Sequence, residues 1–440
     1  MDILVIGGGA REHALAWRLA RDEGVRRVRI APGNAGTAAV AEAVADLDIS
    51  DPLAVARHAT RERYDLVVIG PEGPLAAGVA DELISARMPV FGPSRSAARL
   101  ESSKAFAKQQ MQRAGIPTAA SRAFTDPEAA IDHLHAQDEP PVVKADWLAS
   151  GKGVVVADSH EAAEAAVREL FASVAPGATV VLEQRLRGPE VSAFALVSGG
   201  TVVPLAAACD YKRLRSGDHG PNTGGMGAYT PVPWFGTAEL ERAAADIFEP
   251  IAWRMTRDQV PYRGVLYAGL MLTADGPMVI EFNARFGDPE AQVILPILEG
   301  ELSAALLGTA TGDRALMEGS VSIRHGAAVG VVVASEGYPE APILGRPLDG
   351  AEPAAASDDG PTLLFHAGTR QARDGGYETS GGRVVTVVGR GSDLDGARSA
   401  AYERLADVDL GGAQARDDIA ARELAPSDLG DRAELGHQAR

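Results

Sequence analysis

The chain has 440 residues, 46% of them hydrophobic and 23% charged, as in an ordinary globular protein of about three domains. A formal net charge of −18 disfavours nucleic acid or an anionic membrane as a partner, and the single cysteine, Cys209, excludes an internal disulfide framework and a multi-cysteine zinc site. No signal peptide or membrane-spanning apolar run is evident, so we expect a cytoplasmic protein.

Apolar strands and helices alternate over the first hundred residues. Residues 3–6 predict a buried strand, residues 7–9 a glycine turn and residues 11–21 a helix, and further strands are expected at residues 28–30 and 66–69. This alternation predicts a doubly wound α/β domain that binds its ligands at the carboxyl ends of the strands.

The glycine turn does not match the NAD-binding pattern. Glu12 stands where the third glycine belongs, and Ala31 and Pro32 stand where an acidic residue should close the second strand. Two interpretations stay open. Main-chain N–H groups and Arg11 bind a phosphate at the turn, or the glycines only let the helix pack closely on the sheet.

Two lysines in the middle of the chain call for anionic partners. Lys104 begins a helix expected to end at Ala114, where a cation opposes the helix dipole; the alternative is a solvated lysine at a frayed end. Lys144 lies in an apolar strand, and residues 147–153 and 154–157 complete a hairpin whose loop can close over phosphates. A nucleotide phosphate would offset the cost of burying Lys144.

The segment 278–290 carries oxygen ligands on a strand. Alternation sends the apolar residues 278, 280 and 282 to one face, and Glu281 and Asn283 to the other. This pair suits a nucleotide-bound Mg²⁺, and Arg285 suits a carboxylate or phosphate. The alternative is a surface edge strand that ends in a turn at residues 288–289.

Three later segments complete the expected organisation. Residues 265–272 predict a buried strand that pairs with the metal-bearing strand through a turn at residues 275–277. The polar, glycine-rich residues 218–229 predict a long functional loop without regular structure. Residues 326–425 predict a smaller α+β domain with His366 and Arg383 as candidates to face a shared cleft, and residues 426–440 a disordered tail.

In this order, the segments resemble the phosphoribosylamine–glycine ligase family of the ATP-grasp superfamily, over roughly residues 1–424. The most specific stretches are residues 9–15, 31–37, 219–229 and 281–290. The resemblance implies an α/β and α+β multidomain fold. It has an N-terminal doubly wound domain at 1–103, a two-part ATP-grasp domain at 104–325 with a small lid subdomain at about 122–192, and a C-terminal α+β domain at 326–425.

The resemblance also implies roles for individual residues. Those expected to bind ATP are Lys104, Lys144, Gly151, Lys152, Gly153, Glu183, Gln184, Leu186 and Glu190. Within this set, the hinge from Glu183 to Leu186 is expected to face adenine and Glu190 the ribose. Glu281 and Asn283 are the implied ligands of Mg²⁺ or Mn²⁺. Those expected around glycine and the acyl phosphate are Asp210, Lys212, Gly225 and Arg285, and those expected around phosphoribosylamine are Gly9, Arg11, Asn34, Gly36 and Glu72.

The implied reaction joins glycine to 5-phosphoribosylamine through glycyl phosphate, with ATP converted to ADP and phosphate. We expect a monomer that acts on small molecules, without nucleic acid or membrane partners. Trp147 stands where similar proteins usually have glycine, which leaves the closure of the phosphate loop open. The rival interpretations are another ATP-grasp ligase of purine precursors, a regulatory protein that kept the fold without catalysis, and an NAD oxidoreductase.

Overall fold

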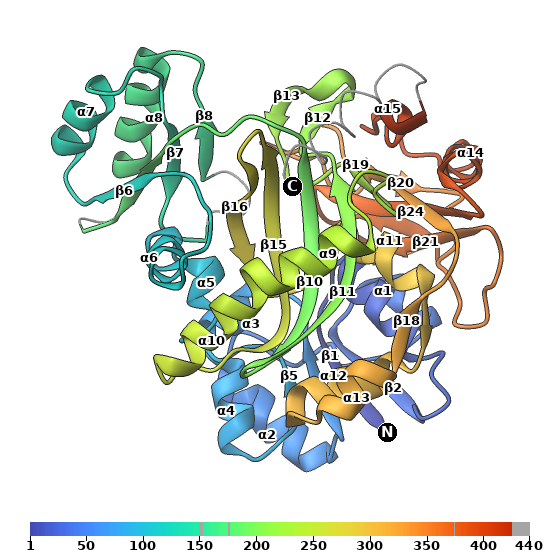
Figure 1. Cartoon of the computed structure of the whole chain (residues 1–440). Coiled ribbons are helices and arrows are strands. Elements are labelled where there is room, and N and C mark those ends of the chain that lie inside the picture. Colours follow the sequence, from blue (N-terminus) through green and yellow to red (C-terminus); the bar gives the residue numbers. More distant parts are fainter. Residues whose placement is uncertain (149–152, 175–176, 374, 425–440) are drawn as a thin grey trace.

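The computed structural model describes residues 1–148, 153–174, 177–373 and 375–424. Its N-terminal part, blue in Figure 1, is a five-stranded parallel sheet in the order β3-β2-β1-β4-β5. The strands are β1 (Asp2–Gly7), β2 (Arg27–Pro32), β3 (Glu42–Ala43), β4 (Leu66–Ile69) and β5 (Val90–Phe91), and the helices are α1 (Ala10–Leu19), α2 (Pro52–Glu62), α3 (Glu72–Ala77) and α4 (Val79–Ser85). The prediction of a doubly wound α/β domain is confirmed.

Two helices lead from this sheet into the middle of the chain, α5 (Arg99–Ser102) and α6 (Lys104–Ala114). The Ser103 hydroxyl accepts a hydrogen bond from the Phe106 N–H at 3.2 Å and so caps the start of α6. Gly115 ends the helix with a φ of 71°, a left-handed conformation that glycine adopts easily. The predicted bounds of α6 are therefore confirmed.

Residues 121–183 form a separate small unit, seen at the upper left of Figure 1. Its antiparallel sheet has the order β6-β9-β7-β8 and is covered by two helices. The elements are β6 (Ser121–Phe124), α7 (Pro127–His135), β7 (Val142–Ala145), β8 (Val154–Val156), α8 (His160–Ala172) and β9 (Val180–Glu183). The hairpin expected around Lys144 is present as the antiparallel pair β7–β8.

The centre of the molecule is an eight-stranded sheet in the order β16-β15-β10-β11-β14-β19-β24-β21. Its strands are β10 (Glu190–Ser198), β11 (Thr201–Asp210), β14 (Gly227–Thr230), β15 (Arg263–Thr273), β16 (Gly276–Asn283), β19 (Ala327–Ala334), β21 (Thr362–His366) and β24 (Arg383–Gly391). The expected hairpin of β15 and β16 is confirmed. Because β14 pairs with β19, the C-terminal strands continue the sheet that carries the predicted metal ligands.

Helices and short strands cover and extend this sheet. The helices are α9 (Thr237–Ala243), α10 (Glu249–Arg257), α11 (Glu290–Ile294), α12 (Leu302–Thr311), α13 (Arg314–Gly319), α14 (Leu394–Leu405) and α15 (Ala421–Leu424), with a π-helical turn at Ala244–Phe248 between α9 and α10. The short strands are β12 (Arg213–Arg215), β13 (His219–Asn222), β17 (Leu298–Gly300), β18 (Val321–Ile323), β20 (Pro347–Leu348), β22 (Thr369–Gln371) and β23 (Tyr377–Thr379). Within the described residues, every helix is too short or too polar to cross a membrane.

The prediction that residues 218–229 lack regular structure is wrong. A 3₁₀ turn (Ser216–Asp218) leads into β13, which pairs with β12 as an antiparallel ribbon, and β14 then enters the large sheet. The polar side chains of this segment gave no apolar alternation, but strand pairing needs only main-chain groups.

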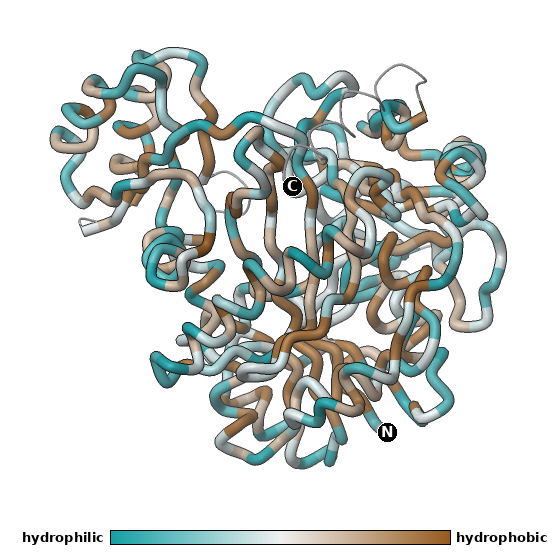
Figure 2. Tube along the Cα trace, viewed as in Figure 1, coloured by the Kyte–Doolittle hydropathy of each residue, from teal (hydrophilic) through white to brown (hydrophobic). Residues whose placement is uncertain are grey.

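Apolar residues concentrate where the N-terminal sheet meets the large sheet, as the brown segments at the lower centre of Figure 2 show. One tie between distant parts of the chain is Trp17 of α1, which is 1% exposed. Its ring packs edge-on against Phe365 of β21 at 5.7 Å, and its indole N–H donates to the Ala355 carbonyl at 2.9 Å. Helix α1 is thereby fixed to the C-terminal strands.

Replacing Trp17 by alanine should lower the free energy of unfolding by about 3–5 kcal/mol, because the change opens a cavity and leaves the Ala355 carbonyl unpaired. Urea unfolding followed by circular dichroism measures the effect. Trp253, which is 57% exposed, is the matched control, and Trp253→Ala should change stability by less than about 0.5 kcal/mol. Equal losses in both variants would contradict this account of the core.

Candidate active site

The end of β16 carries the two predicted metal ligands, Glu281 and Asn283. A bulge in the pairing with β15 interrupts the strict alternation expected from the sequence. Val279 and Phe282 are both 0% exposed and fill the core, whereas Ile280 is only half-buried. The predicted apolar face is therefore wrong at residues 278 and 280, but Glu281 and Asn283 follow the bulge and keep their spacing of two residues.

Lys104, the first residue of α6, lies beside Glu281, with its Nζ 2.9 Å from the Glu281 Oε2. Burial opposes the charge on Lys104, but the Glu281 carboxylate outweighs it and raises the pKa of the lysine above its ordinary value. Burial also opposes the charge on Glu281, yet Lys104, Lys212 and Lys144 hold the pKa of this carboxyl well below its usual range. A carboxylate from another element thus balances the cation at the start of α6.

Lys144 of β7 is buried, and its partner in the structure is Glu183 at the end of β9. The Lys144 Nζ lies 2.7 Å from the Glu183 Oε2 and 3.3 Å from the carbonyl oxygen of Ile280, next to Glu281. A second lysine, Lys108, lies 2.6 Å from the Glu183 Oε1. The Glu183 carboxylate, predicted to lie beside adenine, is thus enclosed by two lysines, and Lys108 is a neighbour that the sequence reasoning missed.

Three more of the residues predicted to bind nucleotide, Gly153, Gln184 and Leu186, lie next to β8 or after β9. Gly151 and Lys152 lie outside the described residues, whereas the Gly153 carbonyl accepts from the Ala145 N–H at 2.7 Å. Gln184 is exposed, and its main-chain N–H donates to the Ala120 carbonyl. Leu186 is half-buried in the segment between β9 and β10.

Arg285 joins the segment after β16 to two carboxylates from the N-terminal part. Its Nη2 lies 2.9 Å from the Glu101 Oε1, and its Nε lies 3.4 Å from the Glu72 Oε2. Burial raises the pKa of Glu101 despite Arg285, and Glu72 adds to the rise. Burial acts in the same sense on Glu72, but Arg285 and Arg11 lower its pKa overall. The sequence analysis did not single out Glu101, because nothing near it in the sequence indicates that it pairs with the distant Arg285.

Asp210 is the last residue of β11, and Lys212 lies two residues beyond it, beside Glu190, the first residue of β10. The Lys212 Nζ lies 2.6 Å from the Glu190 Oε2, so the carboxylate predicted to accept from ribose is paired with a lysine in the absence of ligand. Burial raises the pKa of Asp210 to about 7, with Lys212 opposing the rise and Glu290 and Glu190 adding to it. This group of carboxylates can hold an ammonium.

Three further side chains extend this group and were not predicted. The Ser192 hydroxyl lies 2.8 Å from the Tyr267 hydroxyl and 3.3 Å from the Glu290 Oε1. All three residues are buried, and Glu290 begins α11. The sequence signal was weak for Ser192 and Tyr267 because both lie inside apolar strands, where a hydroxyl normally only satisfies its own hydrogen bonds.

Gly225 brings the glycine-rich segment against the residues after β16. Its φ is 112°, and a Cβ there would lie 2.4 Å from the Pro289 Cδ, so only glycine fits. Arg383 of β24 donates to the carbonyls of Gly224 and Asp288, each at 2.7 Å, and its Nη2 lies 3.0 Å from the Asp288 Oδ2. Arg383 thus joins β24 to the glycine-rich segment and to the residues after β16, and its place in a shared cleft stays a prediction.

At the start of α1, Glu12 accepts a hydrogen bond from the main chain of the glycine turn. Its carboxylate accepts from the Gly9 N–H at 2.7 Å and is paired with Arg11. A Cβ on Gly7 would lie 2.4 Å from the Glu12 Cγ, so this side chain fills the turn. The phosphate considered for the turn would compete with Glu12. Arg11 also donates to the Phe286 carbonyl at 3.1 Å, which connects the turn to the segment that carries Arg285.

Asn34 and Gly36 form a second loop at the carboxyl end of the N-terminal sheet. The Asn34 side-chain amide donates to the carbonyls of Gly8 and His366, at 2.9 and 2.7 Å. A Cβ on Gly36 would lie 2.4 Å from the His366 Cγ, so the loop packs directly on that ring. His366 is 0% exposed and packs against the inner side of this loop. The prediction that His366 faces a cleft is therefore wrong.

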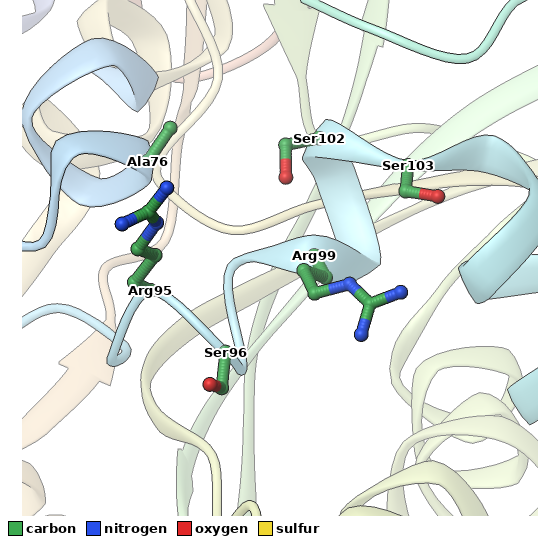
Figure 3. A pocket seen from close by; sticks show the side chains of 6 residues that line it. All are labelled: Ala76, Arg95, Ser96, Arg99, Ser102 and Ser103. Atoms are coloured by element: carbon green, nitrogen blue, oxygen red, sulfur yellow. The ribbon is translucent and has the colours of Figure 1, made fainter. Parts of the chain in front are cut away.

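A surface pocket is lined in part by α3 and α5, the helices that also carry Glu72 and Glu101. Figure 3 shows its lining, which consists of Ala76, Arg95, Ser96, Arg99, Ser102 and Ser103. Ser103 also donates to the carboxylate of Asp146, just after β7, so α6 begins in contact with the small unit. The pocket contains none of the predicted site residues.

The predicted residues therefore form three groups. Lys104, Lys144, Glu183 and Glu281 meet around β16; Arg285, Glu72 and Arg11 meet at the N-terminal sheet; and Lys212 and Glu190 pair beside Asp210. The groups adjoin each other along residues 281–290. Such an arrangement offers a strip of cations to a polyphosphate, with carboxylates at one end to hold an amino group.

Three family models match the chain in sequence order. They describe the N domain of phosphoribosylglycinamide synthetase at residues 1–101, its ATP-grasp (A) domain at residues 102–291 and its C domain at residues 328–422. The chain is 49% identical to phosphoribosylamine–glycine ligase of Streptomyces coelicolor, over 96% of this chain and 99% of that protein. It is 46% identical to the protein of the same name from Mycobacterium leprae, over 95% and 97% of the two chains.

Solved structures agree with these matches. The crystal structure of phosphoribosylamine–glycine ligase from Thermotoga maritima has a TM-score of 0.80 and 34% identity, over 95% of this chain and 100% of that chain. The biotin carboxylase domain of 2-oxoglutarate carboxylase from Hydrogenobacter thermophilus has the same fold, with a TM-score of 0.69 and 16% identity over 94% and 91% of the chains. By sequence and by structure, the chain belongs to the phosphoribosylglycinamide synthetase family.

Proposed function

We propose that this protein ligates glycine to 5-phosphoribosylamine and converts ATP to ADP and phosphate, the second step of de novo purine biosynthesis. The observation that carries the proposal is the meeting of Lys104, Lys144 and Glu281 around one strand end, with Arg285 four residues further on. Its relatives in two bacteria bear the name phosphoribosylamine–glycine ligase, which supports the same activity.

The first step activates glycine, because a carboxylate is a poor acyl donor. A glycine carboxylate oxygen attacks the γ-phosphorus of ATP, the bond from that phosphorus to the bridging oxygen breaks, and glycyl phosphate and ADP form. Such a transfer depends on positioning and charge neutralisation and needs no protein nucleophile. Lys104, Lys144 and Arg285 supply that charge, while ionised Asp210 with Glu290 holds the glycine ammonium.

In the second step, the phosphoribosylamine nitrogen attacks the acyl carbon, the bond from that carbon to the phosphate oxygen breaks, and phosphate leaves together with the proton that the amine loses. Gly9, Arg11, Asn34, Gly36 and Glu72 hold this substrate at the carboxyl ends of the N-terminal strands. Arg11 and Arg285 both reach the Phe286 carbonyl, so the amine site and the acyl phosphate site share one segment. The glycine-rich segment at Gly225 shields the acyl phosphate from water.

Glu281 and Asn283 fit Mg²⁺ as an ion bound together with the nucleotide. They provide one carboxylate and one amide oxygen, and the described part of the chain has no group of three or more His, Cys, Asp or Glu side chains able to hold an ion alone. Mg²⁺ suits such a partial set because it retains phosphate oxygens as ligands, and when bound it neutralises phosphate charge. Mn²⁺ takes similar ligands, and we propose that it can substitute.

The remaining assignments follow from the same function. The residues proposed to bind ATP also include Gly151, Lys152, Gly153 and the hinge from Glu183 to Leu186, with Glu190 at the ribose. Residues 1–103, 104–325 and 326–425 are the proposed domains, with residues 122–192 as the lid of the second. We propose that the protein acts as a cytoplasmic monomer on small molecules, without nucleic acid or membrane partners.

The activity predicts ADP release only when ATP, Mg²⁺, glycine and phosphoribosylamine are all present. Phosphoribosylamine can be generated in place from ribose 5-phosphate and ammonia, and each component is omitted in turn. If ADP release required a different carboxylate or amine, the proposed ligase mechanism would stand but the proposed substrates would be wrong. Folded protein that releases no ADP would support the non-catalytic interpretation.

Replacing Glu281 by glutamine should lower kcat by about 100-fold or more, because it removes the metal-ligating charge and the partner of Lys104. ADP release at saturating substrates measures the effect. Glu299→Gln, at an exposed pair with Arg324, is the control and should leave kcat unchanged. Normal turnover in folded Glu281→Gln protein would remove the metal assignment.

The raised pKa of Asp210 predicts a pH dependence. Its carboxyl is protonated below a pKa of about 7, so the ionised form that holds the glycine ammonium is lost as pH falls. Between pH 8 and pH 6, kcat/KM for glycine should fall about tenfold in the wild type, but stay low and flat in Asp210→Asn. The formation of phosphoribosylamine from ribose 5-phosphate and ammonia also depends on pH. Dividing the wild-type profile by the Asp210→Asn profile removes this shared dependence. The exposed Asp275→Asn control should follow the wild type, and a wild-type profile shared by Asp210→Asn would contradict the assignment.

A further inference from the structure

The chain contains only five lysines, at positions 104, 108, 144, 152 and 212, and arginine provides the rest of its 42 basic residues. Lysine is a compact point charge, whereas arginine is a broad planar fork, so a chain that favours arginine has lysine where a compact cation must fit. Four of the five lysines belong to the proposed nucleotide and substrate sites. The remaining one, Lys108, has no assigned role.

Lys108 lies where the small unit is joined to the rest of the molecule. It is 5% exposed, on the second turn of α6, and its Nζ contacts two side chains at 2.6 Å, the Thr118 hydroxyl and the Glu183 Oε1. Thr118 lies in residues 115–120, where the chain enters the small unit, and Glu183 precedes residues 184–189, where it leaves. Thr118 also donates to the Val279 carbonyl of β16 at 2.6 Å. The Lys108 ammonium thus contacts both chain segments that join the small unit to the rest of the molecule. Through Thr118 it is also linked to β16, which carries the proposed metal ligands.

Glu183 also pairs with Lys144, so two cations share one buried carboxylate. Burial lowers the pKa of Lys108 to about 8, with Glu183 opposing the shift and Lys144 adding to it. A nucleotide phosphate that draws Lys144 away would relieve this repulsion. Without Lys108, however, the same movement would leave Glu183 as a buried charge without a partner, which is strongly unfavourable.

We propose that Lys108 is a positioning residue for the nucleotide. It holds the Glu183 carboxylate and the adjoining hinge in place, so that Lys144 is free to bind phosphate. This inference rests on the proposed function, because it takes Lys144 and the hinge as parts of the ATP site. Lys108 itself does not touch the nucleotide.

The test is the affinity of the full-length protein for MgADP, measured by isothermal titration calorimetry. In Lys108→Met, Glu183 retains Lys144 as its remaining cation, so nucleotide binding should weaken by about tenfold or more, equivalent to about 1.4 kcal/mol. The KM for ATP should rise accordingly, while the KM for glycine stays within about twofold of the wild type. In Lys108→Met/Glu183→Gln the carboxylate no longer retains Lys144, so affinity should recover relative to the single variant.

The matched control is Arg18→Met, which breaks the buried pair of Arg18 and Asp22 in α1. It should lower the melting temperature without changing MgADP affinity. If Lys108→Met does not fold, Lys108→Gln keeps a donor toward Thr118 without the charge and should show the same loss of affinity. Wild-type affinity in the folded variant, equal rises of the KM for ATP and glycine, or a double variant no better than the single one would overturn the role of Lys108. Failure of the wild type to bind MgADP would overturn the proposed function as well.

Discussion

The structure depends on the pairing of buried and half-buried charges at the end of β16. Three lysines, Lys104, Lys108 and Lys144, meet two carboxylates there, Glu183 and Glu281. These five side chains come from α6, the small unit and the large sheet, so satisfying their charges also fixes those three parts relative to one another. Buried charges tolerate little misplacement, because each loses its hydration and must recover it from its partners.

An acidic protein needs a local group of cations to bind the polyphosphate of ATP, and this cluster is the proposed one. The chain carries a net charge of −18, so the overall field does not attract anions. The cluster has one more cation than carboxylates, and Arg285, Arg11 and Lys212 lie close to the same strand end. Local surplus charge in a low-dielectric setting acts strongly at short range, whereas exposed carboxylates elsewhere are screened by salt.

Local signals in the sequence were enough for much of the fold. Ser103 and Gly115 define the ends of α6, and the turn at residues 275–277 defines the hairpin of β15 and β16, because each acts through neighbouring main-chain groups. The bulge near Val279 could not be predicted, since it depends on the register with β15. The ribbon of β12 and β13 was missed because it consists of polar residues and glycine.

The sequence identified many of the residues that meet at the candidate site, but it did not show which of them pair with one another. Lys144 clearly required an anion, yet nothing near it in the sequence identified Glu183, and the partnership of Arg285 with Glu101 spans even more of the chain. Lys108 was overlooked because a lysine on an amphipathic helix normally extends into solvent. Such partners are set by which elements the fold brings together.

The continuity of the large sheet has a consequence for how the chain can be divided. Strand β14 lies between β11 and β19, so a fragment that ends before β19 would present the open edge of a buried strand. The same cut would remove Arg383 from Asp288 and His366 from beneath the Asn34 loop. The segment that carries the proposed metal ligands is thus completed by strands that follow it in the chain, so the candidate site can assemble only after β24 has been synthesised.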